Sequence, residues 1–125
     1  MPELPEVETT RRGLAPHCAG RRLLRLHVRE PRLRWPVPAS EPNLVAGLGI
    51  SSLDRRGKYL LFRLDRGVTV ILHLGMSGHM RVVESHRPVQ PHDHVDFELD
   101  NHVILRFNDP RRFGAMDLVA TGELE

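Results

Sequence analysis

The first residues of the chain, MPELPEVETTRRG, place a proline where removal of Met1 would make it the amino terminus. A free α-amino group has a pKa of about 7.7–8.0, so a useful fraction of such an amine is unprotonated at neutral pH. When a secondary amine attacks an aldehyde-like carbon, the iminium ion stays cationic because its nitrogen has no second proton to lose. Pro2 is therefore a candidate nucleophile for covalent catalysis followed by elimination.

Two glutamates follow this proline closely. Glu3 is its direct neighbour, where a carboxyl group can deliver or take a proton at the same carbon. Glu6 lies one helical turn further on and could orient the amine or shape the local field. An ordinary helix start is the alternative interpretation, because acids and prolines are common in first turns. This stretch alone does not decide between the two.

The rest of the chain contains one unusual basic residue. Seventeen of its eighteen basic residues are arginine, and the only lysine is Lys58. An amine can lose a proton, whereas the pKa of arginine lies far above neutrality. Lys58 is therefore a candidate for a role in proton transfer, with chance in an arginine-rich composition as the alternative.

Length and charge limit the class of protein. The chain has 125 residues, of which 40% are hydrophobic, which is enough for one domain with a modest core. Residues 1–66 contain 13 basic and 7 acidic residues, whereas residues 67–125 contain 5 and 9. The basic half indicates an anionic partner, nucleic acid first among candidates, with a solvated arginine surface as the alternative.

Other classes are excluded by what the sequence does not contain. No apolar run approaches the roughly 18 residues that span a bilayer, and the acidic amino terminus is not typical of a signal peptide. We therefore expect a cytoplasmic protein with no membrane partner. Cys18 is the only cysteine, which excludes an internal disulfide and a cysteine-based zinc site, so we expect no cofactor in this chain.

The amino-terminal segment, residues 3–15, is predicted to form a helix. Acids lie early in it and arginines late, as the helix dipole favours, and Gly13 and Pro16 are expected to end it. The apolar residues on its buried stripe are Leu4, Val7 and Leu14.

After the helix the hydrophobic period becomes two. Leu24, Leu26 and Val28 alternate with polar residues, which is typical of a half-buried strand. Residues 42–49 are expected to form a short helix or a turn. Further strands are expected at 50–56, 58–65, 68–74, 79–84, 94–99, 102–107 and 115–119. This pattern predicts a mainly β fold, a two-sheet sandwich or flattened barrel with an amino-terminal helix and room for one further short helix.

Six motifs carry a resemblance to a known family. In order, they are MPELPEVETTRRGL (1–14), RLRWP (32–36), RRGKYL (55–60), LHLGMSG (72–78), HDHVD (92–96) and NDPRRFGAM (108–116). Together they closely resemble the amino-terminal domain of bacterial formamidopyrimidine-DNA glycosylases, the Fpg/MutM family, rather than the related endonuclease VIII. The resemblance covers nearly all of residues 1–125, with weak stretches at 36–50 and 83–91.

This resemblance implies a monomeric base-excision repair enzyme acting on damaged double-stranded DNA. Such an enzyme removes oxidised purines, 8-oxoguanine and formamidopyrimidines, and then cuts the strand on both sides of the abasic sugar by β- and δ-elimination. By the same resemblance, Pro2 forms a Schiff base at C1′, and Glu3 acts as acid or base on the sugar ring and the departing base. Lys58 contacts phosphate and assists β-elimination, and Glu6 supports the amine.

Further residues match those that fill the hole left by a flipped base. In the family these are a methionine, an arginine and a phenylalanine, which here correspond to Met76, Arg111 and Phe113. An arginine can hydrogen-bond the orphaned base, and the two apolar side chains are wedges that replace lost stacking. His73, His92 and Arg111 are expected to contact DNA phosphates or sugars.

Two features of these motifs have simpler interpretations. His92 and His94 could form a metal pair, since alternate residues share a strand face, but without a third ligand in register we expect no metal site. Asp109 is interpreted as a turn residue before Pro110.

The resemblance also implies regions that this sequence does not contain, a helix–two-turns–helix module and a four-cysteine zinc finger. The sequence stops at GELE without a turn signal, so we expect a fragment that supplies one wall of a DNA cleft and binds DNA weakly. A non-catalytic DNA-binding fragment is one alternative. A tautomerase with an amino-terminal proline base is another, although such tautomerases are compact βαβ proteins.

Overall fold

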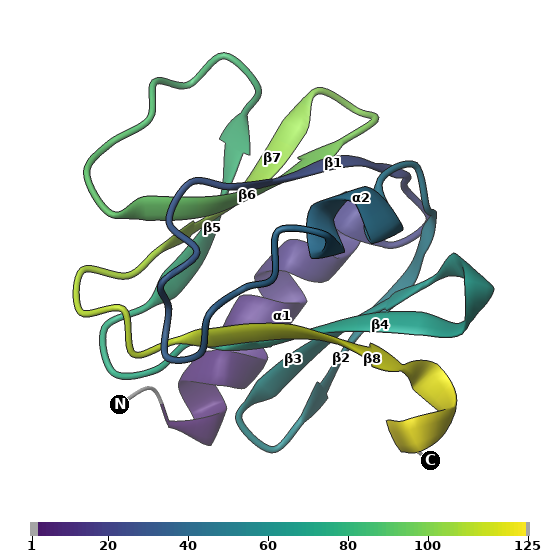
Figure 1. Cartoon of the computed structure of the whole chain (residues 1–125), viewed down its shortest axis with the longest axis horizontal. Coiled ribbons are helices and arrows are strands. Elements are labelled where there is room, and N and C mark those ends of the chain that lie inside the picture. The colour runs from purple at the N-terminus through teal and green to yellow at the C-terminus, as the bar shows by residue number, and fades with distance from the viewer. Residues whose placement is uncertain (1–2, 125) are drawn as a thin grey trace.

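Two four-stranded antiparallel sheets form the layers of the protein (Figure 1), for which a computed structural model describes residues 3–124. The first sheet has the strand order β1 (Leu23–Val28), β6 (Asp93–Leu99), β7 (Val103–Asn108) and β5 (His79–Glu84). The second has the order β2 (Ile50–Arg56), β3 (Tyr59–Leu64), β4 (Val68–His73) and β8 (Ala115–Ala120). The helices are α1 (Leu4–Cys18), α2 (Glu41–Val45) and the short 3₁₀ helices η1 (Asp65–Gly67) and η2 (Thr121–Leu124). This architecture confirms the predicted mainly β sandwich with an amino-terminal helix and a second short helix.

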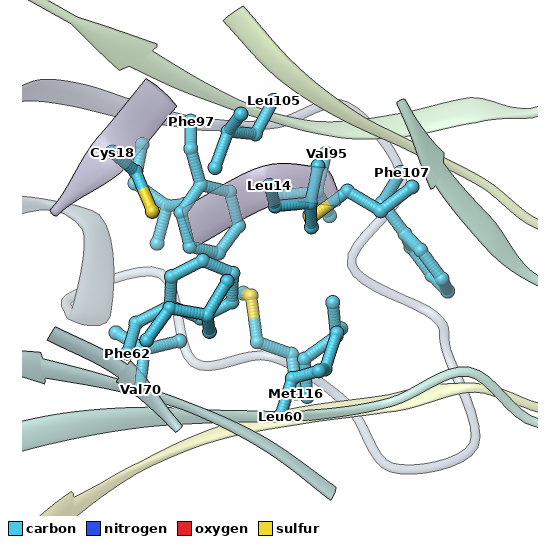
Figure 2. Packing of buried hydrophobic residues seen from close by; sticks show 14 of the residues in the cluster. Leu14, Cys18, Leu60, Phe62, Val70, Val95, Phe97, Leu105, Phe107 and Met116 are labelled. Carbon is cyan, nitrogen blue, oxygen red and sulfur yellow. The ribbon is translucent and has the colours of Figure 1, made fainter. Parts of the chain in front are cut away.

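The core lies between the two sheets and α1. Figure 2 shows Phe62 of β3 and Phe97 of β6 pointing toward each other, and their ring centroids are 4.7 Å apart. Leu14 and Cys18 of α1 complete the same cluster, so the helix covers the open side between the layers. Among residues 3–124, none of the helices combines the length and apolar character needed to cross a membrane.

The first helix is longer than expected. It continues past Gly13 and through Pro16 to Cys18, which corrects the predicted end of the helix. Pro16 removes only one amide donor, whereas Leu14 and Cys18 are both buried one turn apart on the core side. Their burial holds the last turn in helical form. At the other end, Leu4 is 44% exposed rather than buried, because it occupies the first helical position next to the exposed Glu3.

The first strand also differs from the prediction. Leu24 is exposed and Leu23 is fully buried in its place. The pairing register with β6 shifts between Leu23 and Arg25, so the strand contains an irregularity of the β-bulge type. Such an irregularity reverses the inward and outward alternation at one point, and a strict period of two assigns the wrong face to Leu24.

A buried ionic network covers the outer face of β6 and β7. Arg106 is 2% exposed, and its guanidinium donates to the Asp96 carboxylate through Nε (2.9 Å) and Nη2 (3.0 Å). Its Nη1 donates to the carbonyls of Arg87 and Pro88, in the 85–91 loop that lies over the strands. Arg29 donates a further bond of 2.5 Å to Asp96. The two arginines hold the pKa of the Asp96 carboxyl below its ordinary value, against the opposing effect of burial.

We expect Asp96→Ala to lower the free energy of unfolding by about 3–5 kcal/mol, because the buried Arg106 loses the carboxylate to which it donates and keeps the more distant Asp93, 4.0 Å from its Nε. Urea unfolding followed by circular dichroism measures this loss. Asp100→Ala, at an exposed position in the β6–β7 turn, is the control and should change the value little. A loss below about 1 kcal/mol in Asp96→Ala would show that the pair is solvated.

Glu41, the first residue of α2, is a buried acid in an unfavourable setting. It is 7% exposed, and its Oε2 atom has no hydrogen-bond partner. Burial and then the adjacent carboxyl of Asp117 in β8 raise the pKa of Glu41 to about 7. The folded state therefore holds this proton more tightly than the unfolded chain does.

The stability contributed by this proton should be fully present below about pH 4.5 and lost as the pH rises through about 7. We expect Glu41→Gln, which cannot ionise, to be more stable than the wild type by about 2 kcal/mol at pH 8 and by much less at pH 4.5. Unfolding titrations at the two pH values test this. Glu123→Gln, at an exposed site, should show no such pH dependence, and an equal difference at both pH values would refute the assignment.

Candidate functional site

The start of α1 and the β2–β3 turn bring two of the predicted catalytic residues together. Glu3 is the residue before α1, and its carbonyl accepts hydrogen bonds from the amides of Glu6 and Val7. Its carboxylate oxygen Oε2 lies 3.7 Å from Nζ of Lys58, so the two form an ion pair across 55 positions of sequence. Pro2, the predicted nucleophile, lies outside the described residues.

The second acid, Glu6, lies in the first turn of α1 and is exposed. This position agrees with the predicted spacing of one helical turn from the amino terminus. Its role beside the amine stays a prediction.

A cluster around Glu8 fixes the position of α1 on the second sheet. The Glu8 carboxylate accepts hydrogen bonds from Arg11 (2.6 and 2.9 Å) and Arg12 (2.9 Å) of the same helix, and from Arg55 of β2 (3.0 Å). These arginines hold the pKa of Glu8 far below its ordinary value. Because Arg55 is three residues before Lys58, the cluster joins the helix start to the strand that leads to the lysine.

His73 is the last residue of β4, and it lies opposite Tyr59, the residue that follows Lys58. Its ring meets Tyr59 edge-on, with centroids 5.0 Å apart, and its Nδ1 accepts the amide of Gly75 at 2.9 Å. Burial, followed by the positive charges of Arg34 and Lys58, lowers the pKa of His73. A neutral imidazole whose Nδ1 accepts a hydrogen bond carries its proton on Nε2. His73 is thus a neutral donor, which suits a phosphate oxygen.

We expect NMR titration to give His73 a midpoint below the ordinary value of about 6.5, with Nδ1 unprotonated at neutral pH. Arg34→Gln should raise this midpoint because it removes a repulsive charge. The matched change Arg32→Gln removes an arginine that already pairs with Glu30, and it should leave the midpoint of His73 in place. If Arg34→Gln left the midpoint of His73 unchanged, it would contradict the effect assigned to the charge of Arg34.

The two predicted void-filling segments are neighbours because both connect one sheet to the other. Residues 74–78 lead from β4 to β5, and residues 109–114 lead from β7 to β8. Since β4 pairs with β8 and β5 with β7, the two connections lie side by side. Gly75 has φ +71°, and a Cβ there would lie 2.5 Å from the amide nitrogen of Gly114. Only glycine fits at this contact between the two segments.

The side chains predicted to enter the duplex project from this contact. Met76 is 47% exposed and Phe113 is 41% exposed, which is unusual for large apolar residues. The guanidinium carbon of Arg111 lies 5.1 Å from the centre of the Phe113 ring. They border a groove of about 740 Å³, whose lining residues are Arg32, Leu33, Arg34, Met76, Arg111, Arg112 and Phe113.

A third side of this groove comes from the RLRWP stretch, to which no role was assigned from the sequence. The amide of Arg34 donates to the carbonyl of Gly114 at 2.9 Å, which attaches the stretch to the 109–114 connection. The guanidinium of Arg34 lies 5.5 Å from the ring centre of Trp35, a residue that is 53% exposed. Trp35 itself lies outside the groove lining, so the aromatic side chain on the groove is Phe113. Exposed arginines beside an exposed aromatic ring are typical of a nucleic-acid surface.

The HDH stretch differs from expectation in its backbone. β6 begins at Asp93, and His92 lies before it with φ +71°, so the two histidines are not alternate residues of one strand, although their rings still meet edge-on with centroids 6.0 Å apart. His92 is exposed, whereas His94 is buried with Nε2 at 2.8 Å from the carbonyl of Asp109. Within residues 3–124 there is no group of three or more His, Cys, Asp or Glu side chains that could hold a metal ion.

Asp109 is more than the turn residue that the sequence suggested. It is fully buried, and its carboxylate accepts the hydroxyl of Ser77 at 2.8 Å and the amide of Gly114 at 2.7 Å. The Asp-Pro pair signalled a turn, but nothing local pointed to Ser77, which lies 32 residues earlier.

Comparison with known proteins identifies the class to which this fold and site belong. The sequence model of the formamidopyrimidine-DNA glycosylase N-terminal domain matches residues 1–116. The chain therefore belongs to the formamidopyrimidine-DNA glycosylase family, as the motifs predicted.

Individual relatives agree with this assignment. The formamidopyrimidine-DNA glycosylase of Marinobacter nauticus is 57% identical over 114 residues, which cover 91% of this chain and 42% of the relative. That of Hahella chejuensis is 52% identical over 119 residues, covering 95% and 44%. The chain thus spans less than half the length of the curated relatives it matches.

Solved structures share the fold. The Lactococcus lactis enzyme bound non-covalently to DNA containing an abasic site superposes with a TM-score of 0.90 at 31% identity, covering 98% of this chain and 47% of that chain. The same enzyme with DNA containing an oxidised pyrimidine gives a TM-score of 0.90 at 32% identity, covering 98% and 46%.

Proposed function

We propose that this chain is the catalytic amino-terminal domain of a base-excision repair enzyme that acts on damaged double-stranded DNA. It would remove oxidised purines, 8-oxoguanine and formamidopyrimidines, and cleave the resulting abasic site by β- and δ-elimination. The observation that carries this proposal is the Glu3–Lys58 ion pair of 3.7 Å at the residue that follows Pro2. The pair supports the proposal because Glu3 directly follows Pro2 in the sequence, so an acid and an amine would both be at hand for chemistry at the amino-terminal nitrogen.

The covalent step follows from this arrangement. The Pro2 nitrogen would form a bond to C1′ as the C1′–N bond to the damaged base breaks, and the proton that the amine loses would go to the departing base. Glu3 would then supply a proton to the sugar ring oxygen as the C1′–O4′ bond breaks and the nitrogen lone pair forms the C=N bond. The product is an iminium ion. On a sugar that is already abasic, the aldehyde oxygen would leave as water after protonation and give the same ion.

Strand cleavage uses the same cation. The iminium acidifies the C2′–H bond, and the Glu3 carboxylate, which gave its proton to the ring oxygen, would accept the C2′ proton. The electrons of that bond would form the C2′=C3′ double bond as the C3′–O bond breaks and the 3′ phosphate leaves. Lys58 would pair with the phosphate and stabilise its charge. His73 would donate its Nε2 proton to a neighbouring phosphate oxygen.

We assign base flipping to the groove that Met76, Arg111 and Phe113 border. Met76 and Phe113 would enter the gap in the duplex, while Arg111 would hydrogen-bond the orphaned base. Exposed His92 would contact the backbone. His73 contacts Tyr59, the residue after Lys58, and bonds to the amide of Gly75, so it connects the lysine's segment to the wedge and one DNA strand could reach both.

The remaining expectations are part of the same proposal. The protein would act as a monomer in the cytoplasm, where bacterial DNA lies. No cofactor is assigned to these residues, since Cys18 is buried in the core. The family's zinc finger would belong to a different part of a longer protein.

The first test is borohydride trapping on a duplex with an abasic site, with the adduct located by mass spectrometry. We expect an adduct on Pro2 that disappears when Met1 is retained, because the secondary amine is then blocked. Lys58→Gln should slow strand cleavage by about 10- to 100-fold while the trappable iminium still forms, as expected for loss of a charge-assisted contact to the leaving phosphate. Arg66→Gln, an exposed basic residue of η1, is the control and should react at the wild-type rate.

The outcomes separate the competing functions. DNA binding without an adduct, despite a free Pro2, would support the non-catalytic DNA-binding fragment and reject the catalytic proposal. An adduct elsewhere in the chain would reject Pro2 as the nucleophile. A tautomerase would not be trapped on DNA at all.

A further inference from the structure

One buried carboxylate connects the segments that hold the proposed DNA contacts. Asp109 has no exposed surface, and each of its oxygens has a different partner. Oδ1 accepts the hydroxyl of Ser77, next to Met76, at 2.8 Å. Oδ2 accepts the amide of Gly114, next to Phe113, at 2.7 Å. The carboxylate thus bridges both of the sheet-to-sheet connections.

The main chain of Asp109 extends the same network to two further contacts. Its amide donates to the carbonyl of His92 at 3.1 Å, and its carbonyl accepts the amide of Arg112 at 3.2 Å. The Ser77 hydroxyl oxygen, already bound to the carboxylate, also accepts the amide of Arg111 at 3.3 Å. Each of the four proposed contacts, Met76, His92, Arg111 and Phe113, is therefore bonded to this network or adjacent to a residue that is.

We propose that Asp109 is the positioning residue that holds the void-filling side chains as one rigid unit. This inference rests on the proposed function, in which those side chains enter the duplex. A wedge that separates stacked bases must resist being pushed back, and Met76 and Phe113 are exposed, with little packing of their own. The rigidity of these two side chains must then come from the buried side of the connections, where hydrogen bonds to Asp109 hold the two backbone segments together.

The charge of the carboxylate strengthens the bridge. The Ser77 hydroxyl and the Gly114 amide both donate to it, so both bonds are charge-assisted. An asparagine of the same size can still accept the amide, but its NH₂ group then faces Ser77, whose hydroxyl must turn and become the acceptor. Asp109→Asn should therefore replace two charge-assisted bonds with weaker neutral ones without changing the volume at the site.

The test compares trapping on two substrates with the same reactive sugar. In a duplex with an abasic site the wedge must displace the orphaned base, whereas a single-stranded abasic oligonucleotide presents no gap to fill. We expect Asp109→Asn to slow borohydride trapping on the duplex by about 10- to 100-fold, the cost of losing a buried hydrogen bond to a charged group. Trapping on the single strand should change by less than about twofold.

Further measurements keep the result specific. The fluorescence of 2-aminopurine opposite the abasic site should rise on binding the wild type, because insertion separates the base from its neighbours, and rise less with Asp109→Asn. Ser77→Ala removes one bond, so it should slow trapping on the duplex and reduce the fluorescence rise less than Asp109→Asn does. If circular dichroism shows that Asp109→Asn does not fold, Ser77→Ala serves as the test. Asp100→Asn, at an exposed turn, should match the wild type on both substrates.

Each contrary result has a distinct meaning. Equal slowing on duplex and single strand would show that Asp109 only stabilises the fold, and wild-type rates for both variants on the duplex would show that the bridge is not needed. Either result overturns the inference while leaving the proposed function standing. A wild-type chain that gives no adduct with either substrate would instead overturn the proposed function, and the role of Asp109 with it.

Discussion

The contact between the two sheet-to-sheet connections is the constraint on which the rest of the site depends. Strand pairing of β4 with β8 and of β5 with β7 forces residues 74–78 and 109–114 to cross between the layers side by side. They approach so closely that neither Gly75 nor Gly114 has room for a side chain. The residues next to these glycines carry the exposed side chains at this end of the sandwich, whereas Leu74 and Asp109 of the same connections are buried. Met76 and Phe113 are exposed beside the point where the two connections cross.

Close approach alone would leave backbone polar groups without partners, and this cost explains the buried acid. The Gly114 amide is buried in the contact and needs an acceptor, which Asp109 supplies at 2.7 Å. The core below is apolar, with Phe107 directly under both Gly78 and Gly114. A charged acceptor is stable there because its two oxygens and the adjacent main chain are all hydrogen-bonded. The Asp109 network thus satisfies the polar groups of the two crossing connections, while the apolar core packs directly below them.

A feature of this structure could be predicted from the sequence when the residues that define it are close together in the chain. The strands were predictable because alternation is a local property, and Lys58 was noticeable because it is the single lysine among many arginines. The role of Asp109 was not predictable, since its partner Ser77 is distant in sequence and becomes adjacent only once the sheets pair. The exposed Leu24 was misassigned for a related reason, because the register shift in β1 is defined only by its pairing with β6. The motif resemblance predicted the contact residues as a set without indicating what holds them.

His73 connects the segment that contains Lys58 to the turn that contains Met76. It ends β4, so the strand fixes its backbone, and the amide of Gly75 fixes its ring through Nδ1. The same ring meets Tyr59, which directly follows Lys58 in the chain. A phosphate bound at Nε2 would therefore be held by a side chain that contacts the lysine's strand on one side and the wedge turn on the other. If the proposed function holds, this placement would keep a bound DNA strand at a fixed distance from both the reacting sugar and the gap beside it, which a flexible lysine or arginine at this position would not ensure.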